Sequence, residues 1–260
     1  MGISGCNQPA HETALPPPRR GGLLAGFNFT AQAKIERVVE KTFTVSAAGT
    51  LQVDTQGGEI RVSPSSESVV KVTARQKIRA SSEAEADDLL KKLELTIEQS
   101  GSDVRASAKY ERKGLGFHFG FWPPVQVDFI VSVPAGFAAD LRTSGGGITV
   151  GDLAGKVNAR SSGGGIKLGR LGAGVDARTS GGSITLEAAH GPAELKTSGG
   201  SITVGQVAGP ATLSTSGGSI RIDSAENSVR AHTSGGSIRA GIAGRLSEDC
   251  VLSTSGGSVH

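Results

Sequence analysis

The sequence has few aromatic residues, two cysteines and no long hydrophobic stretch. Phe, Trp and Tyr make up only 4% of its 260 residues, so aromatic platforms for stacking sugars are not expected over most of the chain. The cysteines, Cys6 and Cys250, stand at opposite ends and form no metal-binding or redox spacing, which argues against a disulfide framework. No apolar run approaches the roughly 20 residues of a transmembrane helix. These absences predict a protein that is soluble or tethered at one end.

An excess of charge of one sign is also lacking. Lys and Arg number 27 against 24 Asp and Glu, without a strongly basic block, so nucleic acid is not an expected partner. The five histidines share no ligand spacing, and the glycine-rich turns carry Ser and Thr where calcium-binding rolls carry Asp. No P-loop lysine follows these turns. The sequence therefore predicts no metal and no cofactor.

Glycine is abundant, with 39 residues, or about twice its usual share. Much of it falls in a repeated Ser-Gly-Gly turn, whose first five intervals are 18 residues and whose last is 21. Eighteen residues are too few for a βαβ unit, which needs about 30, but they suffice for two short strands and their turns. Such a unit cannot bury its own apolar face, so successive copies must stack. The predicted fold is all-β, a parallel β-solenoid (a single-stranded β-helix) of 18-residue rungs. The turns begin at Ser144, Ser162, Ser180, Ser198, Ser216, Ser234 and Ser255.

Alternation within each copy predicts which side chains point inward. One strand precedes the turn, with inward pairs such as Val175/Ala177 and Ala193/Leu195, and a second strand begins at an isoleucine after it. No aromatic residue occurs after Phe137, as expected if each inward side chain stacks on its equivalents above and below. The glycine pair is expected to supply positive φ or to remove a side chain at a sharp corner. Cys250 falls at an inward position and is predicted to be a buried, inert thiol.

The chain divides into a tether over 1–33, a β-rich part over 34–137 and the repeat array over 138–260. Within the β-rich part, "TQGGEIRV" (55–62) is a diverged copy of the repeat, so stacking is expected to begin early. One helix is predicted over 81–94, opened by a capping box. The array stops in mid-repeat, and we expect it to be truncated at the C-terminus or covered by another chain. The capping box joins Ser82 to Glu85, and the apolar stripe of the helix is Ala86, Leu89, Leu90 and Leu93.

Two segments outside the array are candidate attachment or contact sites. Ile3-Ser4-Gly5-Cys6 resembles the lipobox of bacterial lipoproteins, which makes Cys6 a candidate for lipidation; a disordered N-terminus is the alternative. Before the array, period-two spacing places three phenylalanines on one face of an extended segment that also holds a tryptophan. This segment either covers the open end of the array or forms a contact loop. Its aromatic residues are Phe117, Phe119, Phe121 and Trp122.

One row of basic residues recurs on the outer side of the array. We call Arg142, Arg160, Arg178 and Lys196 the cation row. Acidic residues recur two positions before three of its members, which indicates a solvated ladder of ion pairs, while the alternative is a strip that binds anionic polymers. Scattered carboxylates without a shared cleft do not form the pair that glycoside hydrolysis needs. We therefore predict no catalytic residues and no enzymatic activity.

The alternating strands, the single helix, "VSVPAGF" (131–137) and the serial T-S-G-G-x-I copies resemble the bacterial putative-adhesin family of β-solenoids, also called toastrack or head-GIN-like domains. The resemblance covers roughly residues 38–260. It implies an extracytoplasmic cell-envelope protein, often anchored to the membrane by a lipid, and carries over no ligand residue. The predicted function is a non-enzymatic adhesin or surface scaffold that contacts wall or surface polymers or envelope proteins. The alternative is an envelope-stress or ligand-sensing module.

Overall fold

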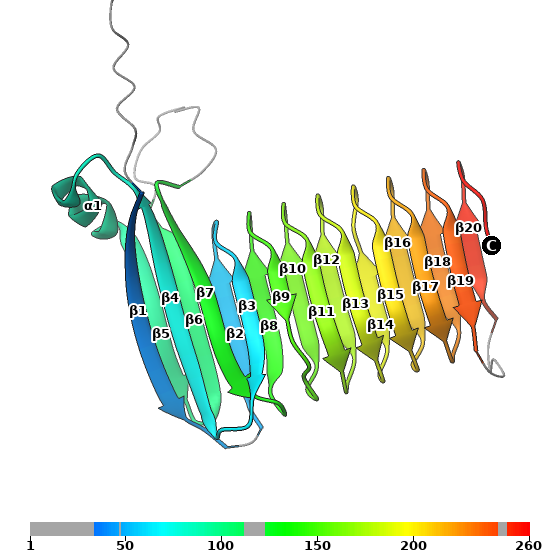
Figure 1. Cartoon of the computed structure of the whole chain (residues 1–260), viewed down its shortest axis with the longest axis horizontal. Helices are drawn as coiled ribbons and strands as arrows, with labels where there is room; N and C mark the ends of the chain where they lie inside the picture. The colour runs from blue at the N-terminus through cyan, green and yellow to red at the C-terminus, as the bar shows by residue number, and fades with distance from the viewer. Residues whose placement is uncertain (1–33, 47, 112–122, 244–248) are drawn as a thin grey trace, which may run out of the picture. The chain divides into compact units, whose positions relative to one another are not determined.

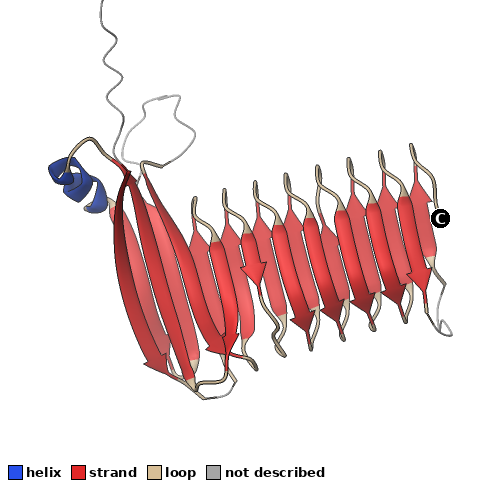
Figure 2. Cartoon of the chain, viewed as in Figure 1, coloured by secondary structure: helices blue, strands red, loops and turns tan. Residues whose placement is uncertain are grey.

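The computed structural model describes residues 34–46, 48–111, 123–243 and 249–260. The strands among them form two ten-stranded sheets, and α1 (Glu83–Leu90) is the single helix of the described chain (Figures 1 and 2). The all-β fold predicted from the repeat is confirmed. Sheet A contains, in order, β1 (Lys34–Thr44), β4 (Val69–Arg79), β7 (Val125–Pro134), β3 (Ile60–Ser65), β9 (Ile148–Val150), β11 (Ile166–Leu171), β13 (Ile184–Ala189), β15 (Ile202–Val207), β17 (Ile220–Ala225) and β19 (Ile238–Ile242). Sheet B contains, in order, β20 (Val251–Thr254), β18 (Val229–Thr233), β16 (Ala211–Thr215), β14 (Ala193–Lys196), β12 (Val175–Thr179), β10 (Val157–Ser161), β8 (Ala138–Thr143), β2 (Thr50–Thr55), β6 (Asp103–Tyr110) and β5 (Leu93–Ser100).

Strands β8 to β20, which we call the array, form the predicted solenoid. Each rung gives one strand to each sheet, and each strand pairs in parallel with the strand one repeat later. Ile184 lies opposite Ile202, and both are fully buried. The inward pairs stack in the same way, with Val175 opposite Ala193 and Ala177 opposite Leu195. Equivalent side chains therefore form continuous aliphatic columns, as the repeat predicts.

The Ser-Gly-Gly turns depend on close approach between rungs rather than on positive φ. Among the described glycines only Gly101, outside these turns, has a positive φ, of 61°. A Cβ on Gly200 would overlap the carbonyl oxygen of Gly182 in the rung before, whereas one on Gly199 would lie 3.3 Å from the Gly181 oxygen. The second glycine is thus the one for which the stack leaves no room. Of the two reasons expected from the sequence, the missing side chain is correct and the positive φ is wrong.

A hydroxyl at or next to the end of each sheet B strand of the array also ties neighbouring turns together, and all of these residues except Thr254 are buried. Thr197 Oγ1 donates to the Gly182 carbonyl of the preceding rung at 2.8 Å and accepts from the Gly200 amide at 3.3 Å. Ser161 makes the same two bonds, both at 2.9 Å, so the hydroxyl and not the methyl group is the shared feature. We call these hydroxyls the threonine column. Its members within the array are Thr143, Ser161, Thr179, Thr197, Thr215, Thr233 and Thr254.

Five of the remaining strands and the helix form a different region, which we call the cap: β1, β4, β5, β6, β7 and α1. Its strands pair mainly antiparallel, as in β1–β4, β4–β7 and β5–β6. The diverged copy of the repeat (55–62) joins β2 to β3, and these two strands lie between the cap and the array: β2 pairs in parallel with β8, and β3 with β9. Stacking therefore includes this early rung, as the sequence predicts. The cap side of the junction buries two large aromatic side chains, Phe129 and Phe137.

Helix α1 is shorter than the predicted 81–94. The chain returns to strand at Leu93, because Leu93 and Leu95 pack against the core from β5. Ser82 caps the helix by accepting from the Glu85 amide at 3.2 Å, as predicted. The return half of the capping box is different, since the Glu85 carboxylate accepts from the Ser81 amide at 2.7 Å. The hydrogen bond that the Ser81 hydroxyl donates to this carboxylate, followed by the one from the Ser81 amide, lowers the pKa of Glu85.

Cys250 occupies the predicted position in the stack, one rung beyond Val229. The register of β18 with β20 places it there, and its Sγ accepts from the Val229 amide at 3.4 Å. Its side chain packs against the core but is only partly buried, so the expected full burial is wrong. Residues in the last rung lack a described neighbour on one side, which accounts for the difference.

Candidate functional site

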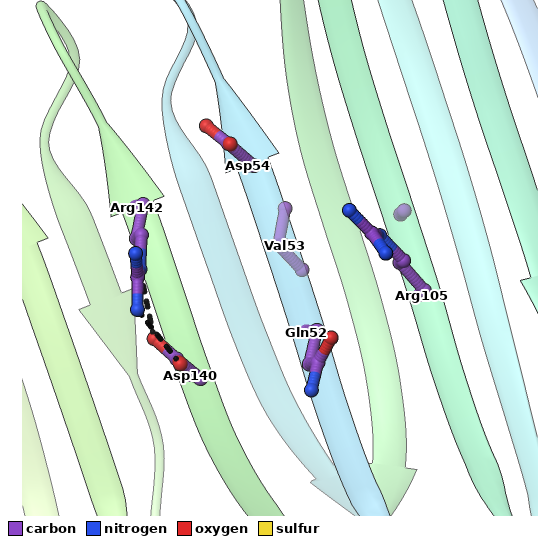
Figure 3. A pocket seen from close by; sticks show the side chains of 7 residues that line it. Gln52, Val53, Asp54, Arg105, Asp140 and Arg142 are labelled. Carbon is purple, nitrogen blue, oxygen red and sulfur yellow. Dashed lines mark hydrogen bonds and ion pairs between the residues drawn. The ribbon is translucent and has the colours of Figure 1, made fainter.

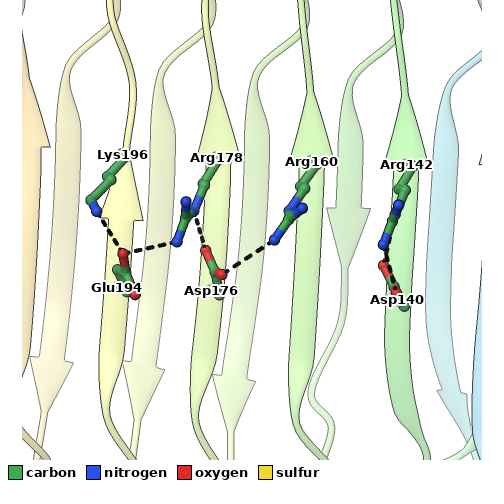
Figure 4. A network of polar contacts seen from close by, with 7 residues as sticks. All are labelled: Asp140, Arg142, Arg160, Asp176, Arg178, Glu194 and Lys196. Carbon is green, nitrogen blue, oxygen red and sulfur yellow. Dashed lines mark hydrogen bonds and ion pairs between the residues drawn. The ribbon is translucent and has the colours of Figure 1, made fainter.

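The outer face of sheet B carries the cation row on four adjacent strands. Strand register places Arg142, Arg160, Arg178 and Lys196 side by side on β8, β10, β12 and β14. A second row, two residues earlier on the same strands, contains Asp140, Asn158, Asp176 and Glu194; we call its three carboxylates the acid row. Figure 4 shows the two rows running across the strands. The stack therefore presents the same polar groups at intervals of about 4.8 Å.

Every member of the cation row forms an ion pair with the acid row. Arg178 contacts two carboxylates, on its own strand and on the next, and so links adjacent rungs (Figure 4). Arg160 makes the longest contact, to a carboxylate on the following rung. The distances are 3.2 Å for Arg142–Asp140, 3.7 Å for Arg160–Asp176, 2.8 Å for Arg178–Asp176, 2.9 Å for Arg178–Glu194 and 2.6 Å for Lys196–Glu194.

These contacts raise the pKa of two guanidinium groups in the row. Hydrogen bonding to Asp140, followed by its charge, raises the pKa of Arg142, and Asp54 adds a smaller Coulombic contribution. Asp176 raises the pKa of Arg178 in the same way, with Glu194 contributing less. The groups are nevertheless largely exposed; 55% of the Arg142 side chain, for example, is open to solvent. The face is thus a hydrated ladder of alternating charge, and its binding of polymers stays a prediction.

A hollow of about 260 Å³ lies where the ladder meets the cap. It spans three adjacent strands, β6, β2 and β8, and is open to solvent on the outer face of sheet B (Figure 3). Arg105 stands on one side and the Asp140–Arg142 pair on the other, with β2 between them (Figure 3). The complete lining is Gln52, Val53, Asp54, Arg105, Ala106, Asp140 and Arg142.

Arg105 is a site residue that the sequence analysis missed. It belongs to β6 in the cap, outside the repeat, so no periodic signal marks it. Register aligns it with Gln52 on β2, and Gln52 in turn with Asp140 on β8, which puts Arg105 in line with the acid row. Only the pairing of strands 50 residues apart in the sequence reveals this.

The other predicted sites lie outside the described residues. These are the candidate lipidation site Cys6 and the candidate contact loop Phe117, Phe119, Phe121 and Trp122. Within the described ranges, no group of three or more His, Cys, Asp or Glu side chains is arranged to hold a metal ion. No described helix is long and apolar enough to cross a membrane.

No protein-family model and no curated protein matches the sequence. Solved structures do match, over most of their own length. A putative adhesin from Parabacteroides distasonis ATCC 8503 is 16% identical over 86% of this chain and 96% of the other, with a TM-score of 0.42. A putative lipid binding protein from the same strain is 14% identical over the same shares of the two chains, with a TM-score of 0.46. A putative cell adhesion protein from Clostridium sporogenes ATCC 15579 is 8% identical over 87% and 98%, with a TM-score of 0.29. Putative adhesins, the kind of protein expected from the sequence, are thus among these neighbours, but at such values the matches identify no binding residue.

Proposed function

We propose that this protein is a non-enzymatic adhesin or surface scaffold of the cell envelope, and that the outer face of sheet B binds anionic polymers. The carrying observation is the cation row itself, four basic residues in register on four adjacent strands. A polymer with phosphate or carboxylate groups at regular intervals meets such a row many times. After the first contact each further one is intramolecular, so weak contacts add up to useful avidity.

The ion pairs of the ladder leave donors available for such a polymer. Exposed ion pairs contribute at most about 1 kcal/mol each, so an incoming anion can compete for the cation. Arg142 directs its Nε and one terminal nitrogen at Asp140, at 3.3 and 3.2 Å, while a guanidinium has five N–H donors. The contact of Arg160 at 3.7 Å is too long for a hydrogen bond and occupies no donor. The pairing orders the cations without using up their capacity to bind.

The site's carboxylates support binding rather than catalysis. Asp54 is exposed, and Asp140 is engaged by Arg142. Neither lies in the apolar surroundings in which enzymes place a general acid. The inside of the array is filled by stacked aliphatic columns, so the hollow on sheet B is at the surface and not in the core.

The test is the triple variant Arg142→Gln, Arg160→Gln and Arg178→Gln, measured for binding to immobilised polygalacturonate and to a poly(glycerol phosphate). It leaves three carboxylates and one ammonium group in the ladder, so we expect at least tenfold weaker binding to any polymer that the wild type holds. The matched control is Lys167→Gln, Arg221→Gln and Arg239→Gln, which removes the same charge from the outer face of sheet A. Equal losses in both variants, or none in the first, would overturn the assignment to sheet B, provided that circular dichroism shows an unchanged fold.

A further inference from the structure

Arg105 differs from the cation row in its ion pairing. The four row members all contact carboxylates, whereas Arg105 forms no ion pair among the described residues. Glu98 lies directly opposite it on β5, yet the two side chains make no ion pair within 4.0 Å. Arg105 is exposed, so its guanidinium keeps all of its donors for solvent or a ligand.

The surroundings of Arg105 form one side of the hollow. The floor is the strand backbone at Val53 and Ala106, whose side chains point into the core and are buried. Gln52 and Asp54 project from β2, between Arg105 and the Asp140–Arg142 pair (Figure 3). The hollow therefore combines a free guanidinium, an amide and two carboxylates within one sugar-sized space.

These groups match an acidic, polyhydroxylated unit. A guanidinium binds carboxylate or phosphate with two parallel hydrogen bonds, which a lysine cannot do. The Gln52 amide donates and accepts, and the Asp54 carboxylate accepts from hydroxyl groups. Pockets for drug-sized ligands measure about 300–1,000 Å³, so the hollow, at about 260 Å³, has room for one small unit only.

We propose that this hollow is the anchoring subsite for an acidic, hydroxyl-bearing unit of the polymer, with the acid group on Arg105 and the hydroxyl groups on Gln52 and Asp54. The inference rests on the proposed function, because the rest of the polymer continues from this subsite along the cation row. Arg142 belongs to both, as the first cation of the row and a wall of the hollow. The subsite fixes where along the face the polymer starts, which the uniform ladder alone cannot do.

The decisive variant is Arg105→Gln, with Arg230→Gln as its matched control. Arg230 lies in the same row of the same face, on the strand before the last in the register that runs from Arg105 through Asp140 and Glu194. It is exposed and forms no ion pair among the described residues, but it does not line the hollow. Both variants remove one unpaired positive charge, so they differ only in the subsite.

Binding is measured by calorimetry with galacturonate oligosaccharides, glycerol phosphate oligomers and neutral dextran oligomers of equal length. We expect Arg105→Gln to weaken binding of the preferred acidic oligomer at least tenfold and Arg230→Gln to weaken it less than twofold. The wild type should not bind dextran. The preference between the two acidic probes identifies carboxylate or phosphate as the anchored group. Equal effects of the two variants would overturn the subsite, while a loss confined to the triple variant would leave the proposed function standing.

A second readout separates failure of the subsite from failure of the proposed function. Monomeric galacturonate and glycerol phosphate are titrated while the side-chain amide signals of Gln52 are followed by NMR. A shift in the wild type that is absent in Arg105→Gln supports the subsite, even if no polymer binds to the cation row. No shift with either monomer, in a protein whose backbone spectrum is otherwise unchanged, would overturn it.

Discussion

The cap and the array bury their apolar side chains in different ways. The cap uses antiparallel strands as long as 11 residues and buries Phe129 and Phe137 at its junction with the array. The array uses parallel strands of three to six residues and has no aromatic residue at all. In the cap no side chain stacks on copies of itself, so the size of a buried side chain at one position does not restrict the size at others. In the array each side chain packs on copies about 4.8 Å away, and one large residue would separate its neighbours.

This difference should determine how far a destabilising substitution affects the rest of the structure. Rungs contact only their neighbours, so array stability is close to a sum of rung and interface terms, and a weakened rung opens toward the nearer end. The cap lies next to the early rung of β2 and β3, where long-range pairs from several segments meet. Damage there should lower the stability of the whole described unit.

The largest expected effect comes from Leu195→Ala in the middle of the array. Leu195 is fully buried, and truncating such a residue costs about 2–5 kcal/mol of unfolding free energy because a cavity remains. Adding Ala193→Val should recover part of the loss, since it recreates the Val175/Ala177 pair of the neighbouring rung. Urea unfolding measures the cost, and hydrogen exchange should show lost protection from β14 to β20 before the cap. Uniform loss of protection would contradict the one-dimensional description.

The next largest effect is expected from Gly200→Ala, compared with Gly199→Ala beside it. The Cβ at Gly200 would overlap the Gly182 carbonyl, so neighbouring rungs must separate, and we expect a cost of about 2–3 kcal/mol. At Gly199 the nearest backbone atom is 3.3 Å away, so the cost should stay below about 1 kcal/mol. Thermal unfolding of the pair measures this. Similar costs at both positions would show that glycine is needed there for a reason other than space.

A smaller effect is expected in the threonine column. Thr197→Val keeps the shape of the side chain but removes its bonds to the Gly182 carbonyl and the Gly200 amide, which should cost about 1–2 kcal/mol. Thr197→Ser should cost less, because Ser161 makes the same bonds in another rung. Chemical denaturation of the two variants gives the comparison. If valine proves as stable as serine, the column fills space and does not join rungs through hydrogen bonds.

How far the sequence predicts the structure also differs between the two regions. In the array, the 18-residue period states which residue lies beside which, so the pairing of Ile184 with Ile202 follows from counting. The cap has no such period, and its order depends on contacts such as Lys77–Asp128 between segments far apart in the sequence. The cation row was therefore predictable, whereas Arg105 was not, because its place beside Gln52 exists only through the pairing of β6 with β2.

The smallest stability effect is expected for the ladder on sheet B. Arg178→Gln breaks contacts of 2.8 and 2.9 Å to two carboxylates, yet its side chain is 42% exposed, so the unfolding free energy should fall by no more than about 1 kcal/mol. Arg160→Gln should cost still less, because its one contact is 3.7 Å long. The difference should vanish in 1 M salt, where the screening length is about 3 Å. Urea unfolding at low and high salt measures both effects. A loss of unfolding free energy well above 1 kcal/mol that persists in high salt would show that the ladder stabilises the fold. A small, salt-sensitive loss is the behaviour of charges free to exchange their partners for those of a ligand.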